Sequence, residues 1–325
     1  MLIPKQVILE VTSRCQLRCK GCPLTLSGYP RGDMDLGYFE SVIDRIDFPC
    51  VVIPWMNGEP LLHPGYADMV RYVTDRKLPM YITTNGHIWH EELFQHITDD
   101  TSCYQIIVSL DGMPGSASIT AARPGSNAYK VVTTIEGLLD LKRRKDALLD
   151  VAVKIVNRGQ DWEEIERYIL YWLERGVDYV CEGRMLSECT VDHMRRYPCQ
   201  YYDNNFMVIR WDGRLVLCAY NDQVVNRGAN PLGELDATTD LLEVYNGEAY
   251  EHYRRRQKVG IYDGPCAACG FAYTGMGMDG EVRFRRALDK RIFYRRDYYN
   301  QFYSLKEKRK PVRYYAAGAK AEAAR

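Results

Sequence analysis

Six short apolar runs alternate with stretches of helical spacing between Pro4 and Gly183, and this alternation limits the fold more than any other feature. Short apolar runs of this kind favour strands, and apolar residues repeated every three to four positions favour helices. Strands that alternate with helices predict a parallel sheet. The predicted strands are Val7–Val11, Cys50–Trp55, Met80–Thr83, Tyr104–Ser109, Asp150–Val156 and Asp178–Cys181, and the predicted helices are Leu36–Ile46, Tyr66–Arg76, Glu91–His96, Tyr129–Arg144 and Asp161–Arg175.

Three cysteines follow the first predicted strand directly. Cys15, Cys19 and Cys22 lie in the run VTSRCQLRCKGCP with the spacing C-x3-C-x2-C. Soft thiolates suit iron, so three of them on one loop can hold three corners of a cubane [4Fe–4S] cluster and leave the fourth iron open. A zinc knuckle is the alternative, but it needs a fourth ligand, and the nearest histidine, His63, lies far along the chain.

Four polar runs follow or end the next predicted strands. They are Met56–Pro60, Thr84–Gly86, Ser109–Gly112 and Val156–Gly159. Each run alone is ordinary turn chemistry. Because the active sites of parallel α/β sheets lie at the carboxyl ends of the strands, we expect these runs and the cysteine loop to meet at one edge.

The cysteine loop and the four runs, in this order, resemble the radical S-adenosylmethionine (SAM) superfamily. The resemblance implies an α/β fold, a partial (β/α)6 barrel. It also implies that SAM binds the open iron and releases a 5′-deoxyadenosyl radical on reduction. A flavodoxin- or ferredoxin-type protein is the electron donor that we expect.

The resemblance also implies which residues bind SAM. Asn57, Gly58 and Glu59 belong to an N-G-E-P run that stands in for the family's G-G-E-P, whose backbone carbonyls contact the SAM amino group. Asn57 replaces a glycine, and asparagine adopts left-handed conformations less freely, so the local backbone is where this chain departs from the family. The other candidates are Asn85, Ser109 and Asp111 for the ribose hydroxyls or methionine carboxylate, Asn157, and Arg123 as a carboxylate clamp or, equally, a surface loop arginine.

A second group of cysteines begins after Gly183. Cys199, Cys218, Cys266 and Cys269 surround a predicted hairpin, in which Phe206–Trp211 and Leu215–Ala219 flank Asp212-Gly213. Helical spacing from Leu241 to Gln257 leads to the final C-x2-C pair. This order resembles the twitch module, a shortened SPASM domain with an auxiliary [4Fe–4S] cluster. A structural zinc site is the alternative, because four cysteines also satisfy tetrahedral zinc.

The remaining sequence is a basic tail. Between Met276 and Arg313 twelve Lys or Arg residues stand against five Asp or Glu, although the net charge of the chain is zero. Basic and aromatic residues interleaved in this way can bind nucleic acid. We favour instead a helix packed on the acidic body, with an apolar face of Leu288, Ile292, Tyr299, Phe302 and Tyr303. Three units follow: a barrel over 1–185, a small α+β twitch module over 186–275 and a basic helical tail over 276–325.

Composition places the chain in the cytoplasm. The sequence has no apolar run of the roughly 18 to 20 residues that span a bilayer and no signal peptide pattern. Its eleven cysteines point to metal or redox chemistry, because the cytosol keeps thiols reduced.

The chain is similar to compact twitch enzymes of aminoglycoside biosynthesis, which are dehydrogenases and epimerases of aminocyclitols. The resemblance implies that a hydrogen atom is taken from a carbinol carbon of an aminocyclitol or sugar-like molecule, which gives a ketone or an epimer. Arg158 is then the candidate for a substrate hydroxyl contact, or an ordinary turn residue, and Cys181 the thiol hydrogen donor of an epimerase, or a core residue.

The alternative substrate is a ribosomally made peptide. Many peptide-modifying relatives carry an N-terminal leader-binding domain, whereas this chain begins directly at the first strand. We therefore expect a small-molecule substrate, and no membrane or nucleic acid partner. A non-catalytic iron–sulfur electron carrier is a third hypothesis, and the predicted SAM-binding runs count against it.

Overall fold

The computed structural model describes most of the 325 residues. The described residues are 1–25, 28–157, 160–184, 206–219, 232–262, 266, 291–297 and 300–305.

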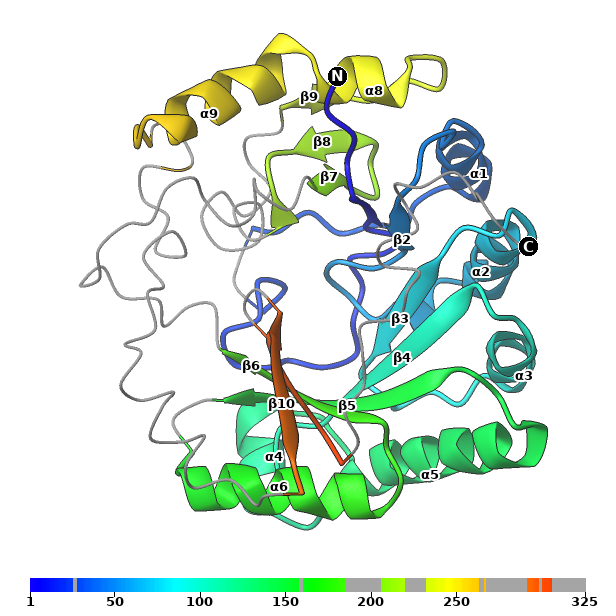
Figure 1. Cartoon of the computed structure of the whole chain (residues 1–325), viewed down its shortest axis with the longest axis vertical. Helices are drawn as coiled ribbons and strands as arrows, with labels where there is room; N and C mark the ends of the chain where they lie inside the picture. Colours follow the sequence, from blue (N-terminus) through cyan, green and yellow to red (C-terminus); the bar gives the residue numbers. More distant parts are fainter. Residues whose placement is uncertain are drawn as a thin grey trace.

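The described strands form one continuous sheet, in the order β10-β11-β6-β5-β4-β3-β2-β1-β7-β8-β9. Strands β1 to β6, the first six along the chain, pair in parallel, which confirms the predicted sheet. Figure 1 shows how this sheet curves around the centre of the molecule, as in a partial barrel. Their bounds are β1 Gln6–Leu9, β2 Val51–Ile53, β3 Met80–Thr84, β4 Cys103–Ser109, β5 Asp150–Asn157 and β6 Tyr179–Arg184.

The helices lie between successive strands and cover the outer face of the curved sheet (Figure 1). Asp35, Asn127 and Asp161 each accept a hydrogen bond from a backbone N–H in the first turn of the helix that follows, which explains where these helices begin. The five predicted helices are present, and α4 and a short 3-10 turn were not predicted. The bounds are α1 Leu36–Asp44, η1 Pro60–Leu62, α2 Tyr66–Asp75, α3 Glu91–Asp99, α4 Ala117–Ala122, α5 Ala128–Lys145 and α6 Trp162–Glu174.

The strand side chains alternate between two apolar layers. Val151, Val153 and Ile155 of β5 belong to the main core between sheet and helices. Ala152 faces the other way, toward the inner side of the curve, where it packs with Cys181 of β6. This parity decides which residues of each strand face the inside of the barrel.

A hairpin after residue 205 extends the sheet beyond β1. Strand β7 (Phe206–Ile209) pairs in parallel with β1, and β8 (Arg214–Val216) returns antiparallel to β7. Gly213 has a φ of +80° in the turn, which confirms the predicted turn position. The strand β9 (Gly233–Glu234) and the helices α8 (Leu241–Tyr245) and α9 (Glu248–Lys258) follow, so the predicted single helical stretch is two helices.

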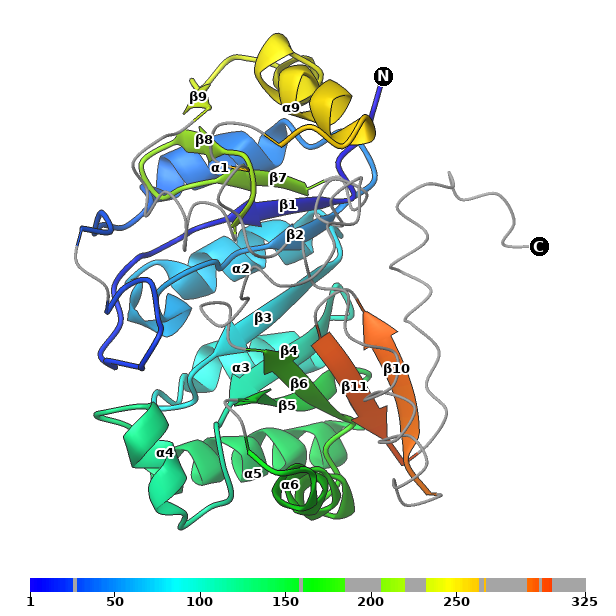
Figure 2. The ribbon, with the colours of Figure 1, turned by 90° about the vertical axis from the view of Figure 1, so that its left-hand side faces the viewer.

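The prediction of a helical tail is wrong for the described residues 291–297 and 300–305. These residues form strands β10 (Phe293–Asp297) and β11 (Asn300–Ser304), and β11 pairs antiparallel with β6 (Figure 2). The open edge of β6 offers unpaired backbone groups, and aromatic residues favour strands, so the hairpin satisfies groups that a helix would leave exposed. Ile292 and Tyr303 are nevertheless buried, as expected for the apolar face, while Leu288 and Tyr299 lie outside the described residues.

None of the helices in the described ranges is long and apolar enough to cross a membrane.

Candidate active site

The cysteine loop follows β1, and its thiols lie near enough for Cys19 and Cys22 to act on Cys15. The pKa of Cys15 is raised to about 11, mainly by burial and also by the charges of Glu59, Cys19 and Cys22, against a hydrogen bond from Leu17 that lowers it. The Leu17 N–H lies 3.4 Å from the Cys15 sulfur. Such N–H contacts to sulfur are typical around iron–sulfur clusters.

These thiols fit a cluster better than a single metal ion. The charges of Cys19 and Cys22 raise the pKa of Cys15, so a cation that neutralises the three thiolates would stabilise them. No three cysteine, histidine or carboxylate groups of the described ranges converge closely enough to hold one ion. In a cubane the thiolates bind different irons, so they need not converge on one point.

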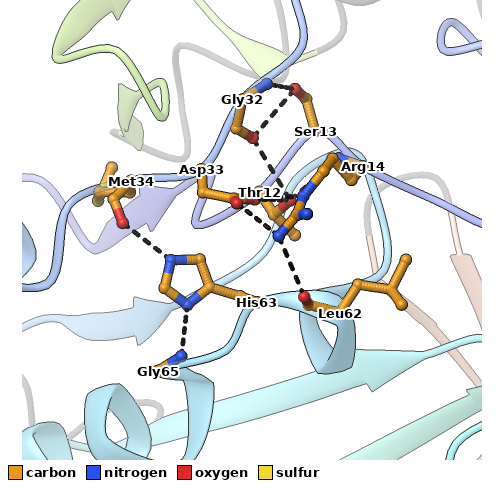
Figure 3. A network of polar contacts seen from close by, with 9 residues as sticks. All are labelled: Thr12, Ser13, Arg14, Gly32, Asp33, Met34, Leu62, His63 and Gly65. Atoms are coloured by element: carbon orange, nitrogen blue, oxygen red, sulfur yellow. Dashed lines mark hydrogen bonds and ion pairs between the residues drawn. The ribbon is translucent and has the colours of Figure 1, made fainter.

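An ion pair fixes the start of the loop (Figure 3). The Arg14 guanidinium meets the Asp33 carboxylate twice, at 2.8 Å from Nε to Oδ1 and at 2.5 Å from Nη2 to Oδ2. The Thr12 hydroxyl donates to the same Oδ1 at 2.6 Å, and Arg14 Nη2 also reaches the carbonyl of Leu62. The residue before Cys15 is therefore tied both to the segment that leads into α1 and to the turn after β2.

His63 is engaged in the same network (Figure 3) and is not placed as a fourth ligand of the cysteine loop. Its Nε2 lies 2.8 Å from the carbonyl of Met34, and its Nδ1 accepts the N–H of Gly65 at 3.1 Å. Both ring nitrogens thus bind backbone groups. The zinc knuckle with His63 has no support in this geometry.

The far end of the cysteine loop docks on the segment after α4. Arg18 N–H donates to the carbonyl of Pro124 at 3.2 Å, and Lys20 N–H donates to that of Ala122 at 3.0 Å. These bonds bring the loop against the segment that carries Arg123.

The N-G-E-P run packs directly against the cysteine loop. Gly58 has a φ of +72°, and a Cβ there would lie 2.5 Å from the carbonyl oxygen of Thr12. The Glu59 N–H donates to the carbonyl of Arg14 at 2.7 Å. Gly58 is therefore required both for its conformation and for this close approach.

Asn57 does not need the left-handed conformation that its place in the motif brought into question. Among the described residues, Lys77 and Asp146 are the non-glycine residues with positive φ. The Asn57 amide instead donates to Glu10 Oε1 at 2.7 Å, and the Tyr29 hydroxyl donates to the same oxygen at 3.0 Å. Asn57 thus anchors the run to the end of β1.

The Glu59 carboxylate joins the ends of β2 and β3. It accepts hydrogen bonds from the Thr84 hydroxyl at 2.7 Å, from the Asn85 N–H at 2.6 Å and from the Leu61 N–H at 3.3 Å. The side chain is 1% exposed, and burial raises its pKa to about 7 against the opposing effect of these bonds. Asn85 also places its amide 3.2 Å from Gln16 Oε1 and 3.8 Å from the Cys15 sulfur.

Arg123 and Asp111 bind each other in the interior. Arg123 Nε donates to Asp111 Oδ2 at 2.9 Å, and its Nη1 donates to the carbonyl of Ser109 at 2.9 Å. Burial lowers the pKa of Arg123, but the charge of Asp111 outweighs it and raises the pKa above its usual value. Asp111 Oδ1 accepts the N–H of Val156, so this pair fixes the ends of β4 and β5. Arg123 is 9% exposed and is not a surface arginine.

The two candidate catalytic residues differ in what the structure says of them. Cys181 is fully buried on the inner face of β6, and Arg158 lies outside the described residues. Asn157 shares the strand face of Ile155, and its amide donates to Glu182 Oε1 at 2.8 Å. The side chain of Asn157 is thus held on the helix-covered side of the sheet.

Two of the four cysteines of the second group are described. Cys218 follows β8 and packs against an apolar cluster that Cys15 and Cys22 also contact. This cluster, called the inner apolar cluster below, includes Ile8, Ile53 and Val208 and is separate from the one around Ala152. The buried Cys266 sulfur lies 3.5 Å from the amide Nε2 of Gln257 on α9. Cys199 and Cys269 lie outside the described residues.

Three further residues escaped the sequence analysis. Lys154 lies on the inner face of β5, in register with Ser109 and Cys181, and no described residue binds its ammonium. Glu10 and Glu182 hold Asn57 and Asn157. The alternation within DVAVKIVN could have shown that Lys154 faces the inside, because Val151, Val153 and Ile155 fill the opposite face. No local pattern could have shown the roles of the two glutamates, because their partners are distant in sequence.

Comparison with known proteins identifies the region that contains the second group of cysteines. The model of the SPASM family, an iron–sulfur cluster-binding domain, matches residues 199–270. A cofactor-modifying protein of the tungsten-containing aldehyde ferredoxin oxidoreductase of Pyrococcus furiosus is 24% identical over 315 residues, which cover 82% of this chain and 87% of that protein. The heme synthase of Methanosarcina barkeri, described as AdoMet-dependent, is 26% identical over 152 residues, or 41% of this chain and 43% of that protein.

The chain is a radical SAM enzyme with a SPASM-type module. This radical SAM enzyme uses SAM and [4Fe–4S] clusters, including an auxiliary cluster, so iron–sulfur replaces zinc as the interpretation of the second group.

The fold agrees with that of a solved radical SAM structure. BtrN in complex with AdoMet and 2-DOIA superposes with a TM-score of 0.54 at 17% identity, over 80% of the radical SAM enzyme described here and 89% of BtrN. At this identity the likeness concerns the fold alone.

Proposed function

We propose that the enzyme removes a hydrogen atom from a carbinol carbon of an aminocyclitol or sugar-like molecule and yields a ketone or an epimer. The observation that carries this proposal is the inner apolar cluster, which Cys15 and Cys22 contact from one module and Cys218 from the other. Apolar side chains beside both sets of thiols exclude water, and the exclusion of water protects reactive intermediates from side reactions. The likeness to BtrN, solved with AdoMet and 2-DOIA, supports the small-molecule class.

In this proposal each group of cysteines holds one cluster. Cys15, Cys19 and Cys22 hold the SAM-binding cluster, and Cys199, Cys218, Cys266 and Cys269 hold the auxiliary one. When bound, the clusters supply one-electron chemistry, the first by reducing SAM and the second by offering an acceptor for a substrate electron. A flavodoxin- or ferredoxin-type donor completes the proposal.

The way in which the strand ends are held supports the SAM-binding role that we propose for them. The side chains of Glu59, Asp111 and Arg123 form buried hydrogen bonds within the protein, and these bonds fix the ends of β2 to β5. Gly58 and Glu59 then present backbone groups beside the cysteine loop, while Asn57, Asn85, Ser109 and Asn157 complete the set of proposed SAM contacts and supports.

Lys154 supports an oxygen-bearing substrate. Its ammonium shares the inner face with Ser109 and Cys181 on the neighbouring strands, because residues paired in register point to the same side. Since no acidic residue in the described part of the chain pairs with it, this cation favours a hydroxyl, alkoxide or carboxylate oxygen of a ligand. We propose that Cys181, the register neighbour of Lys154, returns a hydrogen atom in an epimerase, and that Arg158 is the second hydroxyl contact.

The test uses anaerobically reconstituted enzyme, SAM and dithionite, with a panel of aminocyclitols and short peptides. We expect about eight irons per chain, 5′-deoxyadenosine from SAM, and a ketone or epimer from an aminocyclitol by mass spectrometry. Solvent deuterium in the product that disappears in Cys181→Ala assigns epimerisation, and its absence in the native enzyme assigns oxidation. An enzyme that does not cleave SAM contradicts the proposal.

Peptide modification is the second candidate function. SuiB of Streptococcus suis, solved with its precursor peptide SuiA, superposes with a TM-score of 0.60 at 13% identity, over 83% of this chain and 70% of SuiB. Conversion of a peptide but of no aminocyclitol in the same panel selects this alternative.

A further inference from the structure

The C-terminal hairpin reaches the carboxyl end of β5 through β6. Strand β11 pairs antiparallel with β6 and places Tyr303 opposite Val180 and Phe302 opposite Cys181. The hairpin therefore lies beside β6, although it comes from the end of the described part of the chain (Figure 2). Nothing in the proposed function uses it.

A buried chain of hydrogen bonds links the hairpin to β5. The Tyr303 hydroxyl donates to Glu182 Oε2 at 2.7 Å, and the Asn157 amide donates to Glu182 Oε1 at 2.8 Å. Tyr303 is fully buried and Glu182 is 3% exposed. The Glu182 carboxylate thus bridges β11 and β5, and each of its oxygens has a donor from one of them.

A second carboxylate holds β5 from the opposite neighbour. Asp111, which follows β4, accepts the N–H of Val156 at 2.9 Å. Consecutive residues at the end of β5 are therefore fixed from both flanks, by Asp111 on one side and by Glu182 on the other. The Asp111 side is supported by Arg123, which follows α4, and the Glu182 side by Tyr303 of the C-terminal hairpin.

The end of β5 matters because of what it carries. Lys154 faces the inside two positions before Val156, and the bond between Val156 and Asp111 connects the strand to Arg123 and Ser109. A strand end that frays would move the inner-face cation and slacken the Asp111–Arg123 pair together.

We propose that Tyr303 is a positioning residue, which through Glu182 and Asn157 fixes the carboxyl end of β5 at the site where SAM and substrate bind. This inference rests on the proposed SAM-binding role of the strand ends. It assigns the C-terminal hairpin a part in the active site without a contact to the substrate.

Tyr303→Phe tests the inference because it keeps the buried ring and removes the hydroxyl that Glu182 binds. Tyr72→Phe is the matched control, since the Tyr72 hydroxyl also donates to a carboxylate, Asp44 at 2.9 Å, but on the exposed side of α2. We expect Tyr303→Phe to raise the KM for SAM in substrate-free cleavage about three- to tenfold, and Tyr72→Phe to leave it unchanged.

Hydrogen exchange of reconstituted enzyme gives the second readout. We expect faster exchange in peptides from 150–157 of Tyr303→Phe, with exchange in β1 and α2 as in the native protein. Faster exchange with an unchanged KM for SAM would make the hairpin purely structural and overturn the inference, as would no change in either quantity.

Glu182→Gln guards against a variant that folds poorly. Its effect on the KM for SAM and that of Tyr303→Phe should be less than additive in the double variant, because both act on one bond. Fully additive effects contradict the chain of contacts. Since substrate-free SAM cleavage is the measured activity, an enzyme that cleaves SAM but converts no aminocyclitol would refute the proposed substrate and leave this test intact.

Discussion

The Arg14 guanidinium and the Asp33 carboxylate form a two-contact ion pair beside the first cluster cysteine. Both side chains are partly exposed, at 49% and 29%, so solvent screens their attraction. The value of the pair lies in geometry, because two parallel contacts fix the direction in which the chain enters the cysteine loop.

Asp33→Asn should therefore affect cluster retention more than folding. We expect the free energy of unfolding of the metal-free protein to fall by about 0.5–1 kcal/mol, and the iron content after reconstitution to fall severalfold. Asp68→Asn, which breaks the exposed contact of Asp68 with Arg71 on α2, should leave the iron content unchanged. Equal iron content in both variants would show that the pair does not position the loop.

Gly58→Ala should disable the cysteine loop through a collision. Gly58 and Gly176 both have positive φ, at +72° and +98°, but a Cβ at Gly58 meets the Thr12 carbonyl while one at Gly176 meets nothing within 4 Å. Gly176→Ala should cost about 1 kcal/mol of stability from backbone strain alone. Gly58→Ala should cost more and also abolish SAM binding, measured by titration calorimetry. Similar losses of stability and of SAM binding in the two variants would show that the close approach of Gly58 to the Thr12 carbonyl has no special role.

Glu59 should make the metal-free protein less stable as pH rises. Burial lifts its folded-state pKa from 4.5 to about 7, so the folded protein keeps a proton that the unfolded chain releases. This contribution is complete below pH 4.5 and is lost as pH rises through 7. It amounts to at most about 3 kcal/mol.

Denaturant unfolding of Glu59→Gln at pH 5 and pH 8 checks this expectation. The native protein should lose more stability than the variant between these two values. Glu91→Gln is the control that should leave this difference unchanged, because hydrogen bonds from Gln95 and Trp89 lower the pKa of Glu91, so its carboxyl is ionised throughout the range. A pH slope that Glu59→Gln leaves unaltered would argue that Glu59 ionises at its ordinary pH.

Gln257→Leu should lower the reduction potential of the auxiliary cluster. The Gln257 amide lies 3.5 Å from the Cys266 sulfur, and hydrogen bonds to cluster sulfur favour the reduced state. A redox titration followed by electron paramagnetic resonance measures the change. Gln95→Leu, which removes an exposed amide on α3, should leave the potential where it is. A shift confined to the SAM-binding cluster would place Cys266 in the wrong group.

Lys154→Met should separate substrate binding from SAM binding. Loss of the inner-face ammonium should raise the KM for the converted aminocyclitol about tenfold and leave the KM for SAM in substrate-free cleavage unchanged. Lys130→Met, at an exposed position of α5, serves as the control. An equal rise in both KM values would assign Lys154 to the SAM carboxylate instead.

Local sequence patterns predicted the parts of the fold that depend on local contacts. The alternation of runs predicted six parallel strands, and the Asp212-Gly213 pair predicted the turn of the β7–β8 hairpin. The cysteine loop and the polar run after β2 meet at one edge of the sheet, as their places after the strands predicted. These signals work because strands, turns and loops of this kind are encoded by neighbouring residues.

Long-range pairing is what the sequence did not reveal. Tyr303 and Phe302 fit one face of a helix, but β6 supplies an open edge more than a hundred residues earlier, and no local periodicity reports that edge. Glu182 and Glu10 were missed for the same reason. In the sequence each looks like an ordinary strand residue, because its partner, Tyr303 or Asn57, is distant along the chain. Asn57, an anomaly in the motif, is explained only by Glu10.

The pairing of β7 with β1 also determines when, during translation, the second edge of β1 can be paired. Ile8 pairs with Val208, so one edge of the first strand stays open until about 200 more residues have left the ribosome. At ordinary elongation rates that wait is roughly 10–40 s. The nascent chain thus exposes an apolar strand edge for most of its translation. We expect ribosome-associated chaperones to bind this edge. Slower translation at low temperature prolongs the exposure, so it should do little to improve the yield of folded protein.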